Sequence, residues 1–566
     1  MTDTIPVRFS GCEERDGPLS RGQENILRAL LTGPDQVAED LVLDLPPGTT
    51  VERLAGALRL LLIRHESLRT RYDIGPGRWA QRVAAAGDLA LRVVRCDASR
   101  SRLAAEQLRH ELWLPRFDLE KDLPLRVAVV VSGTECLHLA AAISHLATDG
   151  IGLGLMVGDL RALLAGEELS EQGLQPIDLA ALEARPEIDR RIRGSRRYWA
   201  DQLGKVPQAV FPLEAEGGEA LPQPGILLRS RSAAEALRKI ASRTGTSRSA
   251  AVLSALTVLL ARYAGVPSIG LTSSASNRIL PQLRNYAGTQ STDAFIHVDI
   301  TGAECFDEVA RRVAKGALLA YRNSWYDARE IWEEISEAGR VRGIDAYTRD
   351  CLFNDVSAAG HSPELRHSAT PDPVERFPDG NLTVLEPEWR LSRMALTVYR
   401  LEGEFTASLW TDPRCLPRAE LHSFGRDLVQ TLVRAGESIT DLSKLVSEAE
   451  LAPAGRGPDW HFIDRSWVRL GVVRRLLENA LGHQEFLLEI KHSATGSEET
   501  VIVCHAVDRK GSLTPELLHS TCLDLLPGRS AAMTPHSYNL YAQAPDDLGD
   551  PMAWRQLTAF AQGTGR

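Results

Sequence analysis

The most constraining stretch of the sequence is a pair of apolar runs that lead directly into a polar loop. Residues 123–131 read LPLRVAVVV, residues 136–143 read CLHLAAAI, and the turn residues SGTE separate the two runs. Because both runs are almost continuously apolar, they predict a hairpin of two strands that are covered on both faces. These strands therefore belong to the core of a sheet.

The loop after the second strand carries the first candidate catalytic residue, His145. Four residues later, Asp149 and Gly150 open a run with apolar residues at helical spacing, so the pattern predicts a strand, a tight loop and a helix in that order. An imidazole at the mouth of a buried sheet is a candidate general base. On spacing alone a structural histidine is the more frequent case, and a metal site with Asp149 lacks a third ligand nearby.

Length, charge and cysteine usage limit the classes of function. A chain of 566 residues is too long for one core and predicts three or four domains. The net charge is −10 and the basic residues are scattered, so we expect no nucleic-acid partner. The eight cysteines form no CxxC pair, and no apolar run reaches the length of a membrane span. Without a secretory signal at the start, the chain is expected to be soluble, cytoplasmic and not membrane-bound.

Alternating strand and helix patterns indicate the domain organisation. The expected units are a polar leader at 1–18, two α/β lobes of similar size at 19–185 and 186–450, and a compact α+β unit at 459–566. Residues 167–186 are acidic without sustained periodicity and are a candidate linker. In the second lobe, Ser232 and Glu235 form a predicted capping box for a helix at 233–241.

Several stretches resemble, in order and spacing, motifs of the condensation domains of nonribosomal peptide synthetases. LSRGQENIL (19–27) is similar to the family's opening Ser-x-x-Gln helix, and RHESLRTRY (64–72) to its Arg-His-Glu-x-Leu-Arg-Thr signature. ISHLATDG (143–150) resembles the His-His-x-x-x-Asp-Gly motif, while RRYWADQL and SASNRILPQLRNYAG resemble elements of the second lobe. The resemblance covers residues 19–445 and makes a catalytic role the favoured interpretation of His145.

The resemblance implies a fold of two chloramphenicol-acetyltransferase-like lobes in a V-shaped pseudo-dimer, with the active site midway along a tunnel between them. By the same resemblance, Asp149 is the ion-pair partner of Arg278 and fixes the loop that carries His145. An imidazole there can accept a proton from an attacking amine or hydroxyl, or hold that nucleophile by a hydrogen bond. Gly150 would let the backbone approach the substrate, with its amide facing the thioester oxygen; a simple turn glycine is the alternative.

Two positions depart from the family pattern. Ser144 stands where the family usually has its first histidine, and Gly152 stands where a serine commonly follows Asp-Gly-x. His145, Asp149 and Gly150 are kept. The departures therefore indicate altered chemistry or partner choice rather than loss of activity.

The resemblance predicts a free-standing condensation enzyme, an acyltransferase of natural-product biosynthesis that forms an amide or ester bond. Its donor would be an acyl or aminoacyl thioester on the phosphopantetheine arm of a separate acyl or peptidyl carrier protein, and its acceptor a small amine or alcohol. No Leu-Gly-x-Asp-Ser-like carrier site is present, and no bound cofactor or metal is expected. The alternatives are a coenzyme A-dependent O- or N-acyltransferase of the same fold and a non-catalytic recruitment platform.

The last hundred residues resemble a second family more weakly. VRLGVVRRLLENALG (468–482), VIVCHAV (501–507) and SLTPELLHSTCLDLLPGRSAAMTP (512–535) are similar to the small C-terminal subdomain of adenylating enzymes. Where that family ends in a Gly-Lys loop, APDDLGDPMAW (544–554) has no lysine. The resemblance implies a docking or structural remnant without adenylation activity, and an unrelated α+β domain is the alternative.

Overall fold

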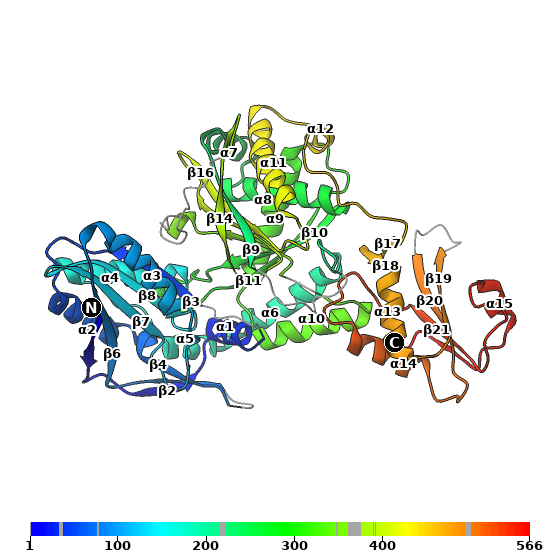
Figure 1. The fold of residues 1–566 in the computed structure, drawn as a ribbon, viewed down its shortest axis with the longest axis horizontal. Helices are drawn as coiled ribbons and strands as arrows, with labels where there is room; N and C mark the ends of the chain where they lie inside the picture. Colours follow the sequence, from blue (N-terminus) through cyan, green and yellow to red (C-terminus); the bar gives the residue numbers. More distant parts are fainter. Residues whose placement is uncertain are drawn as a thin grey trace.

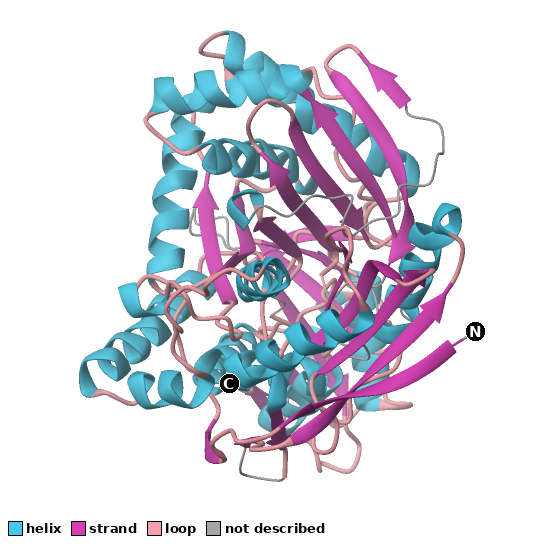
Figure 2. Ribbon diagram, turned by 90° about the vertical axis from the view of Figure 1, so that its left-hand side faces the viewer, coloured by secondary structure: helices cyan, strands magenta, loops and turns pink. Residues whose placement is uncertain are grey.

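The computed structural model describes residues 2–32, 38–75, 79–213, 222–346, 349–359, 375–388, 390, 392–492 and 500–566. Two α/β lobes and a smaller C-terminal domain are seen side by side in Figure 1, with α6 (Pro186–Leu203) and α10 (Ala328–Arg342) running along the base between them. Figure 2 shows the strands of both lobes flanked by helices. The predicted fold class is confirmed.

The N-terminal lobe is built on a five-stranded sheet with the order β1-β6-β7-β8-β3. Its strands are β1 (Thr2–Phe9), β6 (Gly87–Arg95), β7 (Leu125–Ser132), β8 (Glu135–Ser144) and β3 (Ala38–Asp44). Apolar residues of α2 (Val51–Arg64) and α4 (Gly150–Ala165) cover one face, and those of α3 (Ser101–Trp113) cover the other. β7 and β8 pair antiparallel and are buried on both faces, so the predicted core hairpin is confirmed.

The predicted leader at 1–18 is wrong, because this segment contributes strands to the lobe. β1 pairs antiparallel with β6 along its whole length and buries Val7 and Phe9. β2 (Arg15–Pro18) pairs with β5 (Ala80–Val83), which also pairs with β4 (Thr70–Asp73). An eight-residue strand that includes a proline gives a weak sequence pattern, and its pairing partner lies about 85 residues away.

The linker prediction at 167–186 is only partly right. Residues 167–175 form no helix or strand, but Pro176–Glu183 is the helix α5, with a capping box between Gln175 and Asp178. The buried side chains of Leu179 and Leu182 hold α5 in an apolar cluster that also contains residues of the second lobe. The helix has only eight residues, which is too short for a sustained helical period.

The C-terminal lobe contains an eight-stranded sheet with the order β11-β10-β12-β15-β16-β9-β14-β13. The strands are β9 (Gln223–Ser230), β10 (Ser268–Ala275), β11 (Thr292–Asp299), β12 (Cys351–Asp355), β13 (Glu375–Phe377), β14 (Gly380–Glu388), β15 (Met394–Arg400) and β16 (Phe405–Thr411). The helices that pack with it are α7 (Arg231–Thr244), α8 (Arg248–Ala264), α9 (Phe306–Arg322) and α11 (Arg418–Glu437). The capping serine of α7 is Ser230, whose hydroxyl accepts from the Ala233 amide, and not Ser232 as predicted.

The two lobes share one pairing pattern. In the first lobe β6–β7 is parallel and β7–β8 and β8–β3 are antiparallel; in the second lobe β12–β15 is parallel and β15–β16 and β16–β9 are antiparallel. β16 is thus the counterpart of β8. The loop after β16 begins with Asp412, which is ion-paired with Arg414, so the histidine of the loop after β8 has no counterpart there.

The C-terminal domain combines a hairpin, a four-stranded sheet and three helices. Its elements are β17 (Trp460–Ile463), β18 (Ser466–Arg469), α13 (Leu470–Leu481), β19 (Phe486–His492), β20 (Thr500–Val507), α14 (Pro515–Leu525), β21 (Ser537–Tyr541), α15 (Pro551–Gln556) and β22 (Ala561–Gly563). It docks on the end of α10, where the Thr534 amide donates to the Gly343 carbonyl and the Gly528 amide donates to Asp345. No helix among the described residues is long and apolar enough to cross a membrane.

Candidate functional site

His145 lies where the two lobes meet. It follows the last residue of β8, and its side chain is 19% exposed. The ring nitrogen Nδ1 is 3.4 Å from the hydroxyl of Thr289, which comes from the second lobe. The other nitrogen, Nε2, is 3.7 Å from a carboxylate oxygen of Glu39 on the edge strand β3. The imidazole is therefore held between two elements that are distant in the sequence.

Asp149 and Arg278, predicted as partners, form a bidentate ion pair with N–O distances of 2.8 and 2.9 Å. Both side chains are buried. The amides of Gly152 and Gln290 also donate to the Asp149 carboxylate. Burial by itself would raise the pKa of Asp149, but Arg278 and the two amides outweigh it and hold the pKa below its usual range. The Ser291 hydroxyl also donates to this carboxylate at 3.2 Å, so Asp149 is an anion fixed by five hydrogen bonds and not a proton carrier.

Residues 276–292 of the second lobe are fastened onto the first lobe through this ion pair. The guanidinium of Arg278 also donates to the carbonyls of Tyr286 and Gly288 in the same segment. These hydrogen bonds hold the segment around the Arg278 side chain. The hydroxyl of Thr148 in the first lobe donates to the carbonyl of Ala287. The segment therefore places Thr289 beside the His145 ring, and the geometry of the site depends on it.

Ser144 does not supply a second base. Its side chain is buried, its hydroxyl accepts from the Leu146 amide at 3.4 Å, and its own amide donates to the Pro124 carbonyl. An alcohol in a hydrogen-bonded turn cannot take up a proton as an imidazole does. Gly150 is the first residue of α4 and is partly buried. Its proposed amide contact with a thioester oxygen stays a prediction.

Gly152 departs from the family pattern for a steric reason. A Cβ atom at this position would collide with the Ala287 carbonyl oxygen and would lie 2.5 Å from the Thr148 hydroxyl. A serine at 152 is therefore incompatible with this approach of the two lobes.

We expect Gly152→Ala to lower the free energy of unfolding by about 1–3 kcal/mol, because the backbone of residues 286–288 must move to accept the methyl group. Gly158→Ala on the same helix is the matched control, since a Cβ there meets nothing within 4 Å. The control should be neutral or stabilising by about 0.5–1 kcal/mol. Urea denaturation measures both values, and equal effects of the two substitutions would contradict the close contact.

The other sequence motifs of the first lobe are structural. His65 lies 2.9 Å from Asp159 of α4, which also pairs with Arg64. In the helix α1 (Arg21–Thr32), the Gln23 side chain donates to Gln81 and accepts from the Ser20 amide. The first set of contacts joins the end of α2 to α4, the second joins α1 to β5, and none of them reaches His145.

The sequence did not single out Glu39, Thr289 or Glu183. Thr289 and Glu39 contact His145 only because β3 and residues 276–292 converge on it in the folded chain. The signal for Glu39 is a single acidic residue near the start of β3 on the same face of the strand as the apolar Leu41 and Leu43.

Glu183 is a buried carboxyl at the lobe junction. It accepts from the Arg21 amide at 2.8 Å, from the Trp325 indole at 2.7 Å and from the Gln290 side chain at 3.4 Å. Burial outweighs these donors and raises the pKa of Glu183 to about 7. The folded state therefore binds a proton more tightly than the unfolded state at this position.

We expect the stability supplied by protonated Glu183 to be fully present below about pH 4.5 and to be lost as pH rises through 7. The shift corresponds to roughly 3 kcal/mol. Glu183→Gln should flatten the fall in the free energy of unfolding between pH 5 and 8, measured by urea denaturation. Glu187→Gln removes an exposed carboxylate of α6 and should keep the wild-type slope. Identical slopes for Glu183→Gln and wild type would contradict the assignment.

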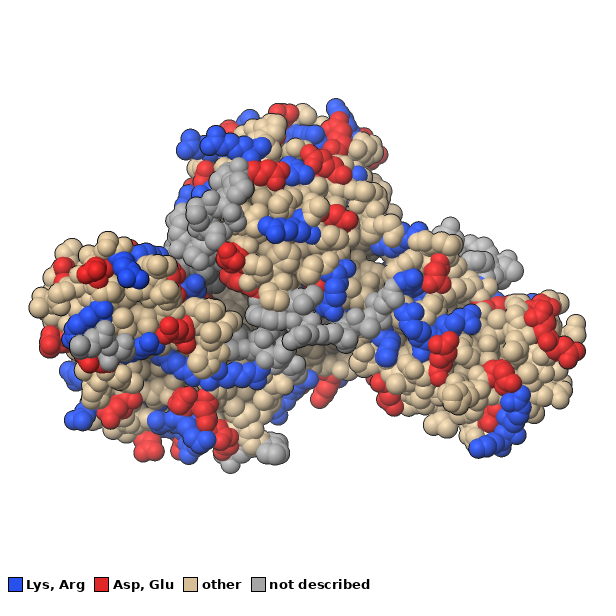
Figure 3. All heavy atoms as spheres, in the orientation of Figure 1, with Lys and Arg blue, Asp and Glu red and all other residues tan. Residues whose placement is uncertain are grey.

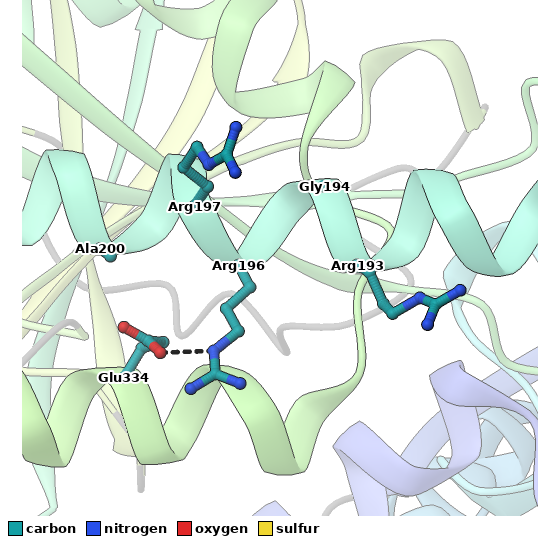
Figure 4. A pocket seen from close by; sticks show the side chains of 6 residues that line it. All are labelled: Arg193, Gly194, Arg196, Arg197, Ala200 and Glu334. Atoms are coloured by element: carbon teal, nitrogen blue, oxygen red, sulfur yellow. Dashed lines mark hydrogen bonds and ion pairs between the residues drawn. The ribbon is translucent and has the colours of Figure 1, made fainter.

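Two cavities lie away from His145. A cavity of about 480 Å³ between α6 and α10 is lined by Arg193, Arg196, Arg197 and Glu334, and Figure 4 shows Arg196 and Glu334 pointing toward each other across it. A second cavity of about 500 Å³ separates α10 from α14 of the C-terminal domain. Among the described residues that line these two cavities there is no histidine and no cysteine. The described residues also contain no cluster of three or more His, Cys, Asp or Glu placed to hold a metal ion.

Two lobes of matching topology, with one histidine loop at their junction, define a two-lobed fold of the chloramphenicol-acetyltransferase-like class. A family model described as "Condensation domain" matches residues 13–343, and the chain belongs to this family. Tyrocidine synthase 3 of Brevibacillus parabrevis is 27% identical over 337 residues, which are 56% of this chain and 5% of that protein. The chain thus spans only a small part of this relative.

Solved structures agree with the fold. The X-domain from teicoplanin biosynthesis superposes with a TM-score of 0.59 at 20% identity, covering 75% of this chain and 96% of that chain. A condensation domain described as mediating chain release from the enacyloxin polyketide synthase gives a TM-score of 0.54 at 22% identity, covering 77% and 84%.

Proposed function

We propose that the protein is an acyltransferase that joins an acyl or aminoacyl group, delivered as the phosphopantetheine thioester of a carrier protein, to a small amine or alcohol. The observation that carries this proposal is the position of His145 at the lobe junction, partly exposed, on a loop fixed by the Asp149–Arg278 ion pair. Membership in the condensation domain family supports the same reaction class. The donor and acceptor would reach the imidazole from opposite sides of the junction.

The chemistry needs one proton acceptor. A donation from Nδ1–H of His145 to the Thr289 hydroxyl would leave the lone pair of Nε2 for the acceptor's proton. The acceptor's nitrogen or oxygen bonds to the thioester carbon, the carbon–sulfur bond breaks, and the proton taken by Nε2 passes to the leaving thiolate. The products are an amide or ester and a free phosphopantetheine thiol.

Intact mass spectrometry tests the proposal. Carrier proteins loaded with a panel of acyl and aminoacyl groups are incubated with the protein and with small amines or alcohols, and the loss of acyl mass from the carrier is followed. We expect release that depends on both the acceptor and His145. Release from acyl-coenzyme A but from no carrier would instead favour a coenzyme A-dependent acyltransferase.

The replacement of the family's first histidine by Ser144 favours a second candidate, a recruitment platform without catalysis. This candidate predicts binding of the loaded carrier with no release of acyl groups under any condition. The retained His145, Asp149 and Gly150 argue against it. The same mass spectra, combined with a carrier-binding measurement, separate the two candidates.

A further inference from the structure

The helices α6 and α10 carry charges of opposite sign on their exposed faces. Both lie along the base of the molecule (Figure 1). Arg196 of α6 is 2.5 Å from Glu334 of α10, and Arg342, the last residue of α10, donates to the carbonyl of Leu203, the last residue of α6. These contacts show that the two helices run beside each other in the same direction. The base therefore presents a basic strip and an acidic strip next to each other.

The basic strip consists of arginines at regular helical spacing. Arg190, Arg193 and Arg197 are exposed and occupy positions i, i+3 and i+7 of α6, so they share one face of the helix. Arg193 pairs with Asp189 of its own helix, whereas Arg190 and Arg197 form no ion pair with any residue that the structure describes. A Cβ atom at Gly194 would meet nothing within 4 Å. This face of α6 is thus open to a partner.

The acidic strip has the same spacing. Glu330, Glu333 and Glu337 occupy positions i, i+3 and i+7 of α10, and Glu333 and Glu337 are exposed. The hydrogen bond to Glu334 raises the pKa of Arg196, and the charges of Glu330 and Glu333 add to this effect. The carboxylates of α10 therefore gather on the side of the helix that adjoins α6.

Two adjacent strips of equal spacing and opposite charge are complementary to themselves. In an isologous contact the same patch of two copies meets across a two-fold axis. With the axis parallel to the helices and midway between them, α6 of each copy lies opposite α10 of the other, and each arginine row faces a glutamate row. The ion pairs within one helix, Arg193 with Asp189 and Arg340 with Glu337, are exposed and weak, so they can be exchanged for pairs across the contact.

We infer that the face formed by α6 and α10 is a dimer interface between two copies of this chain. This inference does not depend on the proposed function. The 18 residues of α6 span about 27 Å at 1.5 Å per residue. Two neighbouring helices are about 20 Å wide, so each copy would bury about 500 Å² and the dimer about 1,000 Å². An interface of this size and charge should be weak and sensitive to salt.

Sedimentation equilibrium of the full chain tests the inference. We expect a monomer–dimer equilibrium between about 1 and 200 µM protein in about 50 mM NaCl. Raising the salt to about 500 mM should weaken the association by about tenfold or more, because the charges of both strips are exposed and are screened.

Reversal of charges identifies the surfaces that meet. Arg193→Glu with Arg197→Glu reverses most of the basic strip, and Glu333→Arg with Glu337→Arg reverses most of the acidic strip. Each double variant alone should associate about tenfold or more weakly than wild type, because strips of like sign then face each other. An equimolar mixture of the two variants should restore dimers to within about threefold of wild type, since each reversed strip meets its complement.

Arg311→Glu with Lys315→Glu is the matched control. These residues are exposed on α9 and have the same i, i+4 spacing as the reversed arginines of α6. The control changes the net charge by the same amount and should associate as wild type does. The melting temperatures of all variants show whether the fold is kept.

Three results would each overturn the inference: wild type that stays monomeric at the highest concentration, association that neither double reversal weakens, or a mixture that restores no dimers. A fourth is binding of a synthetic glutamate-rich helical peptide to monomeric wild type but not to the variant with Arg193→Glu and Arg197→Glu, because it would assign the basic strip to an acidic protein partner. None of these measurements involves acyl transfer, so the proposed function is tested separately.

Discussion

Replacing His145 with alanine is expected to lower acyl transfer to an alcohol acceptor by about 10²–10⁴-fold and transfer to an amine by less. An alcohol must lose its proton as it attacks, so removal of the base slows the step that forms the new bond. An α-amine has a pKa of about 7.7–8.0, so part of it is already neutral near pH 7.5 and needs less help. The measurement is kcat/KM for paired amine and alcohol acceptors with one thioester donor.

The matched control for this prediction is His138→Ala. His138 lies on the same strand β8 but contacts Asp44 and Ser101, far from the lobe junction. It should change kcat/KM for neither acceptor class. Equal losses for amine and alcohol with His145→Ala would refute the proton-transfer role and leave only a positioning role for the ring.

The sequence was sufficient to predict those parts of the structure that are formed by residues close together in the chain. The strand, the loop with His145 and the helix α4 are consecutive in the chain, and the apolar periodicity of their residues indicates each of them. Asp149 caps α4 by accepting from the Gly152 amide, as a residue before a helix is expected to do. The loop that carries His145 could therefore be placed from the sequence of residues 135–165 alone.

Contacts between distant segments could not be predicted from local patterns. Arg278 lies 129 residues from Asp149, and only the resemblance to a family joined them. Glu39 and Thr289 contact the two ring nitrogens of His145. The residue patterns of the two segments that carry them do not predict these contacts. The same reason explains the missed strand β1, whose partner β6 is far along the chain.

The repeated topology of the two lobes is also invisible in the sequence. The parallel, antiparallel, antiparallel order is a property of backbone pairing, which different side chains can satisfy as long as each strand buries apolar residues. β8 and β16 occupy equivalent places, but one leads to His145 and the other to Asp412. Of these two equivalent loops, only the one after β8 carries a histidine at the lobe junction, and the second lobe contributes residues 276–292 to that place.

Arg278→Ala is expected to lower the free energy of unfolding by about 3–5 kcal/mol, because it leaves the buried carboxylate of Asp149 without its counter-charge. The carbonyls of Tyr286 and Gly288 lose a donor as well. At about 2–4 °C per kcal/mol for a lobe of this size, the melting temperature should fall by about 6–20 °C. Calorimetry measures this change, and acyl transfer is followed in parallel well below the transition.

Activity should fall together with stability in this variant, because residues 276–292 place Thr289 beside His145 and lose their anchor. Arg193→Ala removes an exposed arginine that pairs with Asp189 within α6, and should cost no more than about 0.5 kcal/mol. Asp149→Asn combined with Arg278→Ala removes both charges and should cost less than the sum of the two single changes. An Arg278→Ala protein with an unchanged melting temperature and low activity would contradict the structural role, because it would place the guanidinium in the chemistry itself.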